Sequence, residues 1–198
     1  MKKILLIENG SRHTRALAHR LGEHEVRRVK YRNLSAGDIA KADIIVLSGG
    51  HPSVLYHSWF YRKQLELIRT TTKPIIGICL GFELIIRAFG GRLNRLDRKA
   101  HGLRNITVAT DYSFFGGPVL KVWEAHKWAA TFTPESVFEI VASSQYGSEI
   151  IKHRSKPIYA CQFHPEVDSP LNDGSQVLRT ILEMINLDPM HGEGPRPV

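Results

Sequence analysis

The 198-residue sequence lacks the features of a membrane protein and of a disulfide-rich secreted protein. It has no apolar run of the roughly 18 residues that a transmembrane helix needs. Met1-Lys2-Lys3 leads directly into a strand-like segment, without the pattern of a secretory leader. The two cysteines, Cys79 and Cys161, are too few for a disulfide framework and are expected to be reduced thiols. We therefore expect a cytoplasmic protein that makes no membrane contact.

The short motifs of metal and nucleotide binding are also missing. Ten histidines are scattered along the chain, and no His-Glu-x-x-His or Cys-x-x-Cys pair is present. Neither Gly-x-x-x-x-Gly-Lys nor Gly-x-Gly-x-x-Gly occurs. The sequence predicts no metal site, no cofactor and no nucleotide site of its own.

Acidic residues are the scarcer charged class, since 19 Asp and Glu stand against 27 Lys and Arg, for a net charge of +8. Such a surface favours anionic partners through long-range attraction. Basic residues gather within 27–32 and within 92–104, but neither cluster is interleaved with aromatic residues as a nucleic-acid platform would be. We interpret both clusters as solvated faces, with docking to an acidic partner protein as the second interpretation and nucleic acid as the least favoured.

The pattern of short apolar runs predicts the class of fold. In the first half, strand-like and helical segments alternate, which implies crossover connections and a mostly parallel sheet flanked by helices. The strand-like runs are 4–7, 25–31, 43–47 and 75–78, and the helical patterns are 12–21 and 59–68. The predicted fold class is therefore α/β.

The second half differs, because strand-like pieces follow one another without long helices. These pieces are 102–109, 119–125, 137–143 and 149–153, and a helical pattern covers 174–185. They predict an antiparallel portion added to the parallel sheet. A single domain over 1–188 followed by a loose tail at 189–198 fits the length and the 42% hydrophobic content.

Gly77-Ile78-Cys79-Leu80-Gly81 follows an apolar run and precedes a helical pattern, as a cysteine nucleophile requires. A sharp strand-to-helix turn needs close backbone approach, which explains the glycine on each side. At the start of a helix, the free N–H groups and the helix dipole favour the thiolate, so we expect a lowered pKa for Cys79. The alternative is that Cys79 is a small buried hydrophobic residue.

A histidine and a carboxylate stand together much later, in Gln162-Phe163-His164-Pro165-Glu166 at the end of an apolar strand-like run. Residues two apart on an extended chain point the same way, so His164 and Glu166 are expected to face one site. Pro165 biases His164 toward an extended conformation. The three groups have distinct roles in this chemistry. A thiolate attacks a carbonyl, an imidazole moves the proton, and a carboxylate orients the imidazole.

These segments together resemble the class I (triad) glutamine amidotransferases, whose signatures are a Gly-x-Cys-x-Gly elbow and a late Gln-Phe-His-Pro-Glu segment. Val46-Leu47-Ser48-Gly49-Gly50 is similar to the family's oxyanion loop, and the resemblance extends from Lys3 to about Ile185. Residues 4–15 look most like the amidotransferase part of GMP synthetases. The resemblance implies a flavodoxin-like fold and an enzyme that hydrolyses glutamine with Cys79, His164 and Glu166.

Further roles follow from that resemblance. The N–H groups of Leu80 and of Gly50 or His51 are the expected donors to the oxyanion, with Gly49 allowing the peptide to rotate. His126 stands in a segment similar to one that lines the family's glutamine pocket. Because this chain shows no ATP motif, the resemblance implies that ammonia passes to a separate ATP-dependent synthetase subunit, for example one that aminates XMP.

Glu83 departs from the family, which usually has glutamine in this position. A carboxylate removes two N–H donors and adds negative charge close to the substrate and the thiolate. Glu83 could bind the substrate ammonium group, shift the specificity to another γ-glutamyl compound, or leave the site inactive without a partner. We expect Glu83 to be paired, protonated or partly solvated. The alternatives to a glutaminase are therefore a stand-alone γ-glutamyl hydrolase and a catalytically dormant regulatory subunit.

Overall fold

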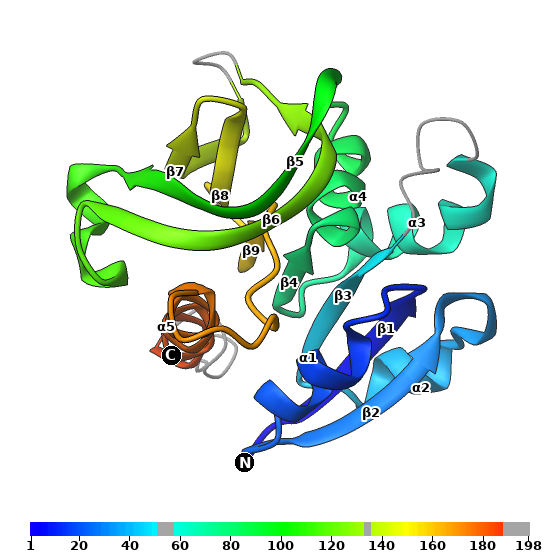
Figure 1. Ribbon diagram of the computed structural model, residues 1–198. Coiled ribbons are helices and arrows are strands. Elements are labelled where there is room, and N and C mark those ends of the chain that lie inside the picture. The colour runs from blue at the N-terminus through cyan, green and yellow to red at the C-terminus, as the bar shows by residue number, and fades with distance from the viewer. Residues whose placement is uncertain (51–57, 133–135, 188–198) are drawn as a thin grey trace, which may run out of the picture.

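The computed structural model describes residues 1–50, 58–132 and 136–187. Nine strands in this part of the chain form one mixed sheet in the order β2-β1-β3-β4-β9-β8-β7-β5-β6 (Figure 1). Five of them run parallel: β1 (Lys3–Asn9), β2 (Glu25–Lys30), β3 (Ile44–Gly50), β4 (Ile75–Ile78) and β9 (Ile158–Cys161). The other four pair antiparallel: β5 (Leu93–Val108), β6 (Val119–Ala130), β7 (Phe138–Ser144) and β8 (Gly147–His153).

Helices cover both faces of the parallel half, as buried parallel strands require. One face packs on α1 (Thr14–Arg20) and α5 (Gly174–Leu187), through Leu17 and Ile181 among others. The other face packs on α3 (Arg62–Thr70) and α4 (Leu80–Ala88), through Ile68 and Ile85 among others. Alternate residues of β1 enter the two cores, which is the two-residue period of a strand buried on both sides.

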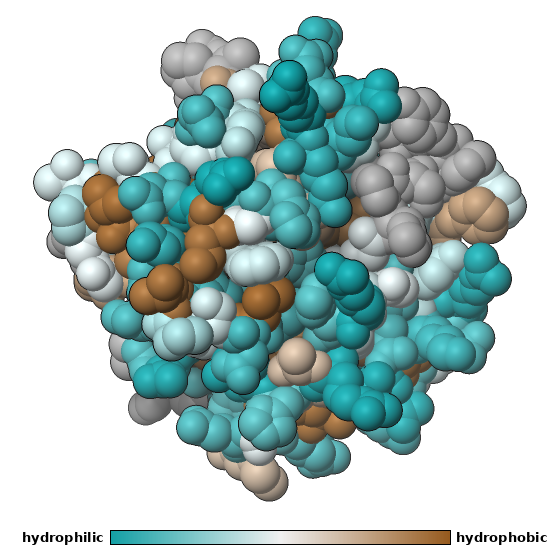
Figure 2. Space-filling view, in the orientation of Figure 1, coloured by the Kyte–Doolittle hydropathy of each residue, from teal (hydrophilic) through white to brown (hydrophobic). Residues whose placement is uncertain are grey.

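The antiparallel half curls away from the plane of the parallel strands. Figure 1 shows the long β5–β6 pair bending across β8 and β9, and both strands of the pair contact α4, the helix that follows β4. The surface in the same view is mostly hydrophilic, with an apolar patch over β5 and β6 (Figure 2). Exposed apolar side chains of this region include Phe114, on the 3-10 helix η3 (Thr110–Phe115), and Val119 on β6. The charged residues of β2, at the sheet edge, include Arg27 and Arg28, which pair with Asp38 and Glu8.

The predicted α/β class with an antiparallel addition is confirmed, but several segments differ from the prediction. The helix α2 (Ala36–Lys41) is missing from the sequence prediction, although Ser35 and Asp38 form a capping box that marks its start. The predicted helix over 59–68 consists of the 3-10 turn η2 (Ser58–Tyr61) followed by α3. β5 begins at Leu93, well before the predicted start at Gly102.

Two further predictions concern the ends and the membrane. The predicted loose tail at 189–198 lies outside the described residues, as does His51. No helix in the described part of the chain is long and apolar enough to span a membrane. A short 3-10 turn, η1 (Tyr31–Asn33), links β2 to the segment before α2.

Candidate active site

Cys79 occupies the turn between β4 and α4, at the N-cap position of the helix. Its φ of 50° and ψ of −101° make it the only residue other than glycine with a positive φ among the described residues. A side chain in this region of φ costs of order 1–3 kcal/mol, which the surrounding structure must supply. The backbone N–H of Cys79 donates to the carbonyl of Cys161 on β9 (2.9 Å), so the neighbouring strand holds the turn in place.

The two glycines of the elbow allow β4 and α4 to approach closely. A methyl group on Gly77 would lie 2.8 Å from the backbone of Gly81, and one on Gly81 would lie 2.3 Å from the carbonyl oxygen of Leu47. Both distances are far below van der Waals contact. The sequence prediction that glycine stands on both sides of Cys79 for close approach is confirmed.

His164 and Glu166 are brought together beside Cys79, but not by an extended strand. β9 ends at Cys161, and residues 164–167 form a turn in which the N–H of Val167 donates to the carbonyl of His164 (3.3 Å). The expectation that an extended chain aligns the two side chains is therefore wrong. The turn still places His164 Nδ1 2.8 Å from Glu166 Oε1, in a buried pair.

The second ring nitrogen of His164 remains available for Cys79, because Nδ1 is taken by Glu166. The Cys79 sulfur and the imidazole lie close enough for each group to shift the pKa of the other. Burial lowers the pKa of His164, but the negative charges of Cys79 and Glu166 outweigh it and raise the pKa to about 10. This arrangement favours an imidazolium held between two anionic groups.

The pKa of Cys79 shifts opposite to the sequence expectation. Burial raises the pKa of the thiol, and the positive charge of His164 opposes that rise. The prediction of a lowered pKa is wrong, because the sequence signals a helix start but does not report how completely the sulfur is desolvated. The thiolate thus depends on a protonated His164 beside it.

The Gly49-Gly50 segment at the end of β3 lies against both side chains. A methyl group on Gly49 would lie 3.0 Å from His164 Cε1 and 3.5 Å from Cys79 Cβ. The Gly49 carbonyl accepts from the N–H of Ser11 (3.1 Å) and from the Ser48 hydroxyl (2.9 Å). Because C=O and N–H point in opposite directions in a trans peptide, this orients the Gly50 N–H away from Ser11.

A cavity of about 440 Å³ opens over Cys79 and His164. Three basic side chains, Arg12, Lys99 and Lys127, contribute to its lining. The remaining lining residues are Gly10, Ser11, His13, Gly50, Cys79, Glu83, Ala125, His126 and His164. The cavity is therefore large enough for an amino-acid side chain and its charged head group, with the buried thiol at one wall.

Glu83 and His126, both predicted on the substrate side, line this cavity. Glu83 is only 1% exposed, and its Oε2 is buried with no hydrogen-bond partner in the described residues. Burial raises the pKa of Glu83 to about 7, while the positive charge of His126 acts in the opposite direction. His126 is also buried, and its Nδ1 lies 2.7 Å from the carbonyl oxygen of Trp128.

Other residues near the site were not identified from the sequence. Asn172 donates to the carbonyls of His164 (3.2 Å) and Val167 (2.8 Å), and its Oδ1 accepts from the N–H of Gly174 (3.1 Å). It thereby fixes the turn that carries His164 to the start of α5. His13 packs on the ring of His164, with centroids 5.4 Å apart. A polar residue shortly before a helix was the available signal for Asn172.

The structure also gathers three potential metal ligands, Glu124, His126 and Glu149, although the spacing of residues predicted no metal site. Glu124 and Glu149 lie on β6 and β8, and neither belongs to a recognisable motif. Only the curl of the sheet brings them together.

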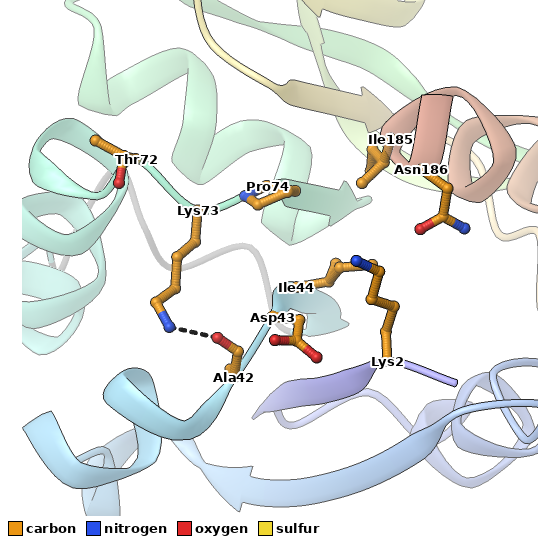
Figure 3. Close-up of a pocket in the computed structure, with 9 residues that line it drawn as sticks. All are labelled: Lys2, Ala42, Asp43, Ile44, Thr72, Lys73, Pro74, Ile185 and Asn186. Carbon is orange, nitrogen blue, oxygen red and sulfur yellow. Dashed lines mark hydrogen bonds between the residues drawn. The ribbon is translucent and has the colours of Figure 1, made fainter. Parts of the chain in front are cut away.

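A second cavity, of about 240 Å³, lies at the opposite end of the parallel strands, where the strands begin (Figure 3). It is lined by residues that precede strands, such as Lys2, Asp43 and Pro74. Lys73 donates a hydrogen bond to the carbonyl of Ala42 at its rim. Functional loops in parallel α/β sheets gather at the carboxyl ends of the strands, where Cys79 and Gly49 stand, so this second cavity is not the candidate active site.

An α/β sheet with a buried cysteine on a strand-to-helix turn, facing a histidine–glutamate pair, is typical of cysteine-dependent hydrolases and amidotransferases. Comparison with known families defines the class further. Residues 5–184 match the family model described as glutamine amidotransferase class-I. The chain belongs to this family, a family of enzymes.

Relatives within the family include glutamine-hydrolyzing GMP synthases. The chain is 36% identical over 133 residues to the A subunit of the GMP synthase of Methanobrevibacter smithii, and the match covers 65% of this chain and 66% of the relative. It is 31% identical over 193 residues to the GMP synthase of Staphylococcus saprophyticus, covering 92% of this chain but only 36% of that longer protein. The matched regions thus span about two thirds and about one third of these relatives.

A solved structure agrees with the fold. A Thermoplasma acidophilum protein described as the A subunit of a GMP synthase has a TM-score of 0.82 and 28% identity, and the match covers 94% of both chains. A glutamine amidotransferase from Thermotoga maritima matches with a TM-score of 0.71 over 95% of this chain and 86% of its own, at 19% identity.

Proposed function

We propose that the chain is a glutaminase that hydrolyses glutamine to glutamate and ammonia, with Cys79 as nucleophile, His164 as acid and base, and Glu166 as the group that orients His164. The observation that carries the proposal is the buried arrangement in which His164 pairs with Glu166 and lies beside Cys79 at one wall of the cavity. In such an arrangement the imidazole can exchange a proton with the sulfur while the carboxylate holds its ring in one orientation.

In the first step, the Cys79 thiolate attacks the side-chain carboxamide carbon of glutamine. The negative charge that develops on the oxygen is stabilised by the N–H of Leu80, at the start of α4, and by that of Gly50. Gly50 lines the cavity beside Cys79, which supports the second donor. His164 then donates its proton to the departing nitrogen, the C–N bond breaks, and ammonia leaves a γ-glutamyl thioester on Cys79.

In the second step, neutral His164 accepts a proton from water, and the resulting hydroxide attacks the thioester carbon. The C–S bond breaks, glutamate is released, and Cys79 returns as a thiolate beside the imidazolium. The raised pKa of His164 supports this resting state, since it stabilises the protonated ring next to the sulfur. Glu83, on the substrate side of the cavity, is proposed to contact the amino-acid head group, and His126 forms part of the wall beside it.

We propose further that the ammonia passes to a separate ATP-dependent synthetase. The names of the relatives, which are GMP synthases or GMP synthase subunits, support a partner that aminates a purine nucleotide, such as XMP. The proposal also follows the domain prediction, in which residues 1–188 form one amidotransferase domain.

One observation favours a second candidate, a γ-glutamyl hydrolase that acts without a partner. Glu83 is a buried carboxylate at the cavity wall, and it can accept but not donate hydrogen bonds when ionised. The α-amino and α-carboxylate groups are the same in glutamine and in γ-glutamyl compounds, so this candidate requires Glu83 to face a donor on the group that replaces the amide of glutamine. The two candidates differ in substrate, and they share the chemistry of Cys79.

The test is to measure ammonia and glutamate release from glutamine, with and without an added synthetase subunit of the GMP synthase type. Wild type is expected to release both, and Cys79→Ala to lose at least about 10³-fold in rate. Cys161→Ala is the matched control, because Cys161 is an equally buried cysteine on the neighbouring strand. It is expected to retain the activity at a somewhat lower stability.

Equal rates for wild type and Cys79→Ala with the synthetase present would contradict the proposal. Release of glutamate from γ-glutamyl peptides, but not from glutamine, would support the hydrolase instead. If a glutamine-analogue electrophile fails to label Cys79 even with the synthetase bound, the chain is a dormant regulatory subunit, and both proposals fail.

A further inference from the structure

Three buried side chains meet behind the wall of the cavity, outside the Cys79 chemistry. Glu124 and His126 are two residues apart on β6 and so share one face of that strand, and Glu149 comes from β8. Because the β5–β6 pair curls across the sheet, β6 passes over β8 (Figure 1). One nitrogen or oxygen atom of each side chain lies within 4.8 Å of those of the other two.

The proton on His126 can be placed from its contacts. Nδ1 lies 2.7 Å from the carbonyl oxygen of Trp128, which can only accept, so Nδ1 carries a hydrogen. Nε2 lies 2.5 Å from Glu124 Oε2. A carboxylate oxygen this close to Nε2 requires a positive species between the two atoms, either a proton on the ring or a metal ion. Histidines that bind metals commonly donate their other ring N–H to a backbone carbonyl, as His126 does.

The two carboxylates have little compensation from their surroundings. Glu124 is 0% exposed and Glu149 is 1% exposed. Within the described residues, Glu149 accepts a hydrogen bond from Ser144 (2.6 Å), whereas Glu124 has His126 Nε2 beside it and no side-chain partner outside the cluster. No Lys or Arg of the described segments forms an ion pair with either carboxylate. One imidazolium at His126 can neutralise only one of the two carboxylates, and a buried charge without compensation is costly, so the cluster calls for a further cation or a shared proton.

We propose that Glu124, His126 and Glu149 bind one divalent transition-metal ion of the Zn²⁺ type. One imidazole nitrogen and two carboxylate oxygens are ligands that Zn²⁺ accepts. Bonds of about 2.0–2.2 Å in tetrahedral geometry separate two ligand atoms by about 3.3–3.5 Å. The side chains therefore need to move only modestly, mainly to widen the separation of His126 and Glu124. The bound ion ties β6 to β8 and holds His126 at the cavity wall.

The test measures zinc binding directly. The protein is stripped with a chelator, dialysed against Zn²⁺ and analysed for metal by mass spectrometry, and its thermal midpoint is recorded with and without the ion. Wild type is expected to retain one more Zn²⁺ per chain than Glu149→Gln and to gain several degrees in thermal midpoint. Because Glu149→Gln retains all the other histidines, the difference in zinc content between the two proteins excludes zinc bound at the surface. Glu66→Gln, on the exposed face of α3, is the matched control and should bind as wild type does.

Circular dichroism checks that the variants fold, and Glu124→Gln serves as a second variant should Glu149→Gln fail to do so. Equal zinc content in wild type and a folded variant overturns the proposal. So does a wild-type protein that binds no Zn²⁺ while Glu149→Gln is more stable than wild type, because the cluster then holds a shared proton. None of these readouts depends on glutamine hydrolysis.

Discussion

His164, which can carry a positive charge, lies between two groups that can carry a negative charge, Glu166 at 2.8 Å and the Cys79 sulfur. An imidazole in such a position must keep one ring orientation to transfer protons in both steps of the proposed reaction. The ion pair with Glu166 supplies that orientation, since Nδ1 has no other partner among the described residues. A substitution of Glu166 should therefore reduce the rate of catalysis more than it weakens substrate binding.

Replacing Glu166 by Gln keeps the size of the side chain and removes its charge. We expect kcat for glutamine hydrolysis to fall by about 10²- to 10⁴-fold with little change in KM, because the orientation and charge of His164 are lost. Steady-state kinetics measures both constants. Glu66→Gln, which is exposed, serves as the control and should change neither. A change in KM with an unchanged kcat would contradict an orienting role.

The raised pKa of His164 also predicts how stability depends on pH. The folded state retains a proton up to a pKa of about 10, whereas the unfolded chain loses it near 6.5. The stabilisation is fully present below pH 6.5 and is lost as the pH rises toward about 10. The difference in unfolding free energy between wild type and His164→Gln should therefore shrink across that interval. Urea titrations at several pH values measure it, and a constant difference would contradict the raised pKa.

At the scale of elements, the junction of β3, β4 and α4 leaves no room for side chains at Gly77 and Gly81. Gly81→Ala would place a methyl group 2.3 Å from the Leu47 carbonyl, so α4 must shift and carry Cys79 with it. We expect a loss of at least about 2 kcal/mol in unfolding free energy and a large loss of activity.

Gly37→Ala, in α2, is the control for this substitution. The nearest atom to the added methyl group would be Ser35 Oγ at 3.8 Å, and alanine is the better helix former by about 0.5–1 kcal/mol. We therefore expect Gly37→Ala to be neutral or stabilising and fully active. Chemical denaturation and the glutaminase assay test the pair. Equal effects at the two positions would contradict the close approach of β3 and α4.

The turn after β9 depends in the same way on Asn172. Asn172→Asp retains an acceptor for the N–H of Gly174 but removes both donors to the carbonyls of His164 and Val167. We expect the loss of about 1–3 kcal/mol in stability and a fall in kcat larger than any change in KM. The exposed Asn105→Asp on β5 is the control. Unchanged kcat in a destabilised Asn172→Asp would limit its role to stability.

The elements also explain which parts of the site could be predicted. Cys79, His164 and Glu166 stand in short segments whose local pattern of glycine, proline and apolar residues indicates their place. Asn172 and the Glu124–Glu149 contact depend on which strands become neighbours after the sheet curls, which no local pattern reports. The direction of the Cys79 pKa shift could not be predicted for a similar reason, because the burial of this side chain results from packing by distant elements.

At the scale of the whole molecule, the net charge of +8 and the basic residues at the cavity, Arg12, Lys99 and Lys127, create a positive field over the site. Glutamine is a zwitterion without net charge at neutral pH, so this field should affect its capture little. A γ-glutamyl peptide with net negative charge should be captured faster. The response to salt therefore separates the two candidate substrate classes.

We expect kcat/KM for glutamine to change by less than about twofold between roughly 0.05 M and 0.5 M salt. For an anionic γ-glutamyl peptide, it should fall several-fold over the same range, and less so in Lys127→Gln. Initial rates at low substrate concentration measure the ratio directly. An equal response of the two substrates would contradict steering by the basic residues.

The hydrogen bond from the N–H of Cys79 to the carbonyl of Cys161 has a consequence for biosynthesis. β9 inserts between β4 and β8, so the strand beside the nucleophile is translated only after the whole antiparallel half. A nascent chain that has passed Cys79 but not His164 carries the thiol without its proton partner. The arrangement of Cys79 and His164 is therefore completed late, when β9 joins β4 to the antiparallel half of the sheet.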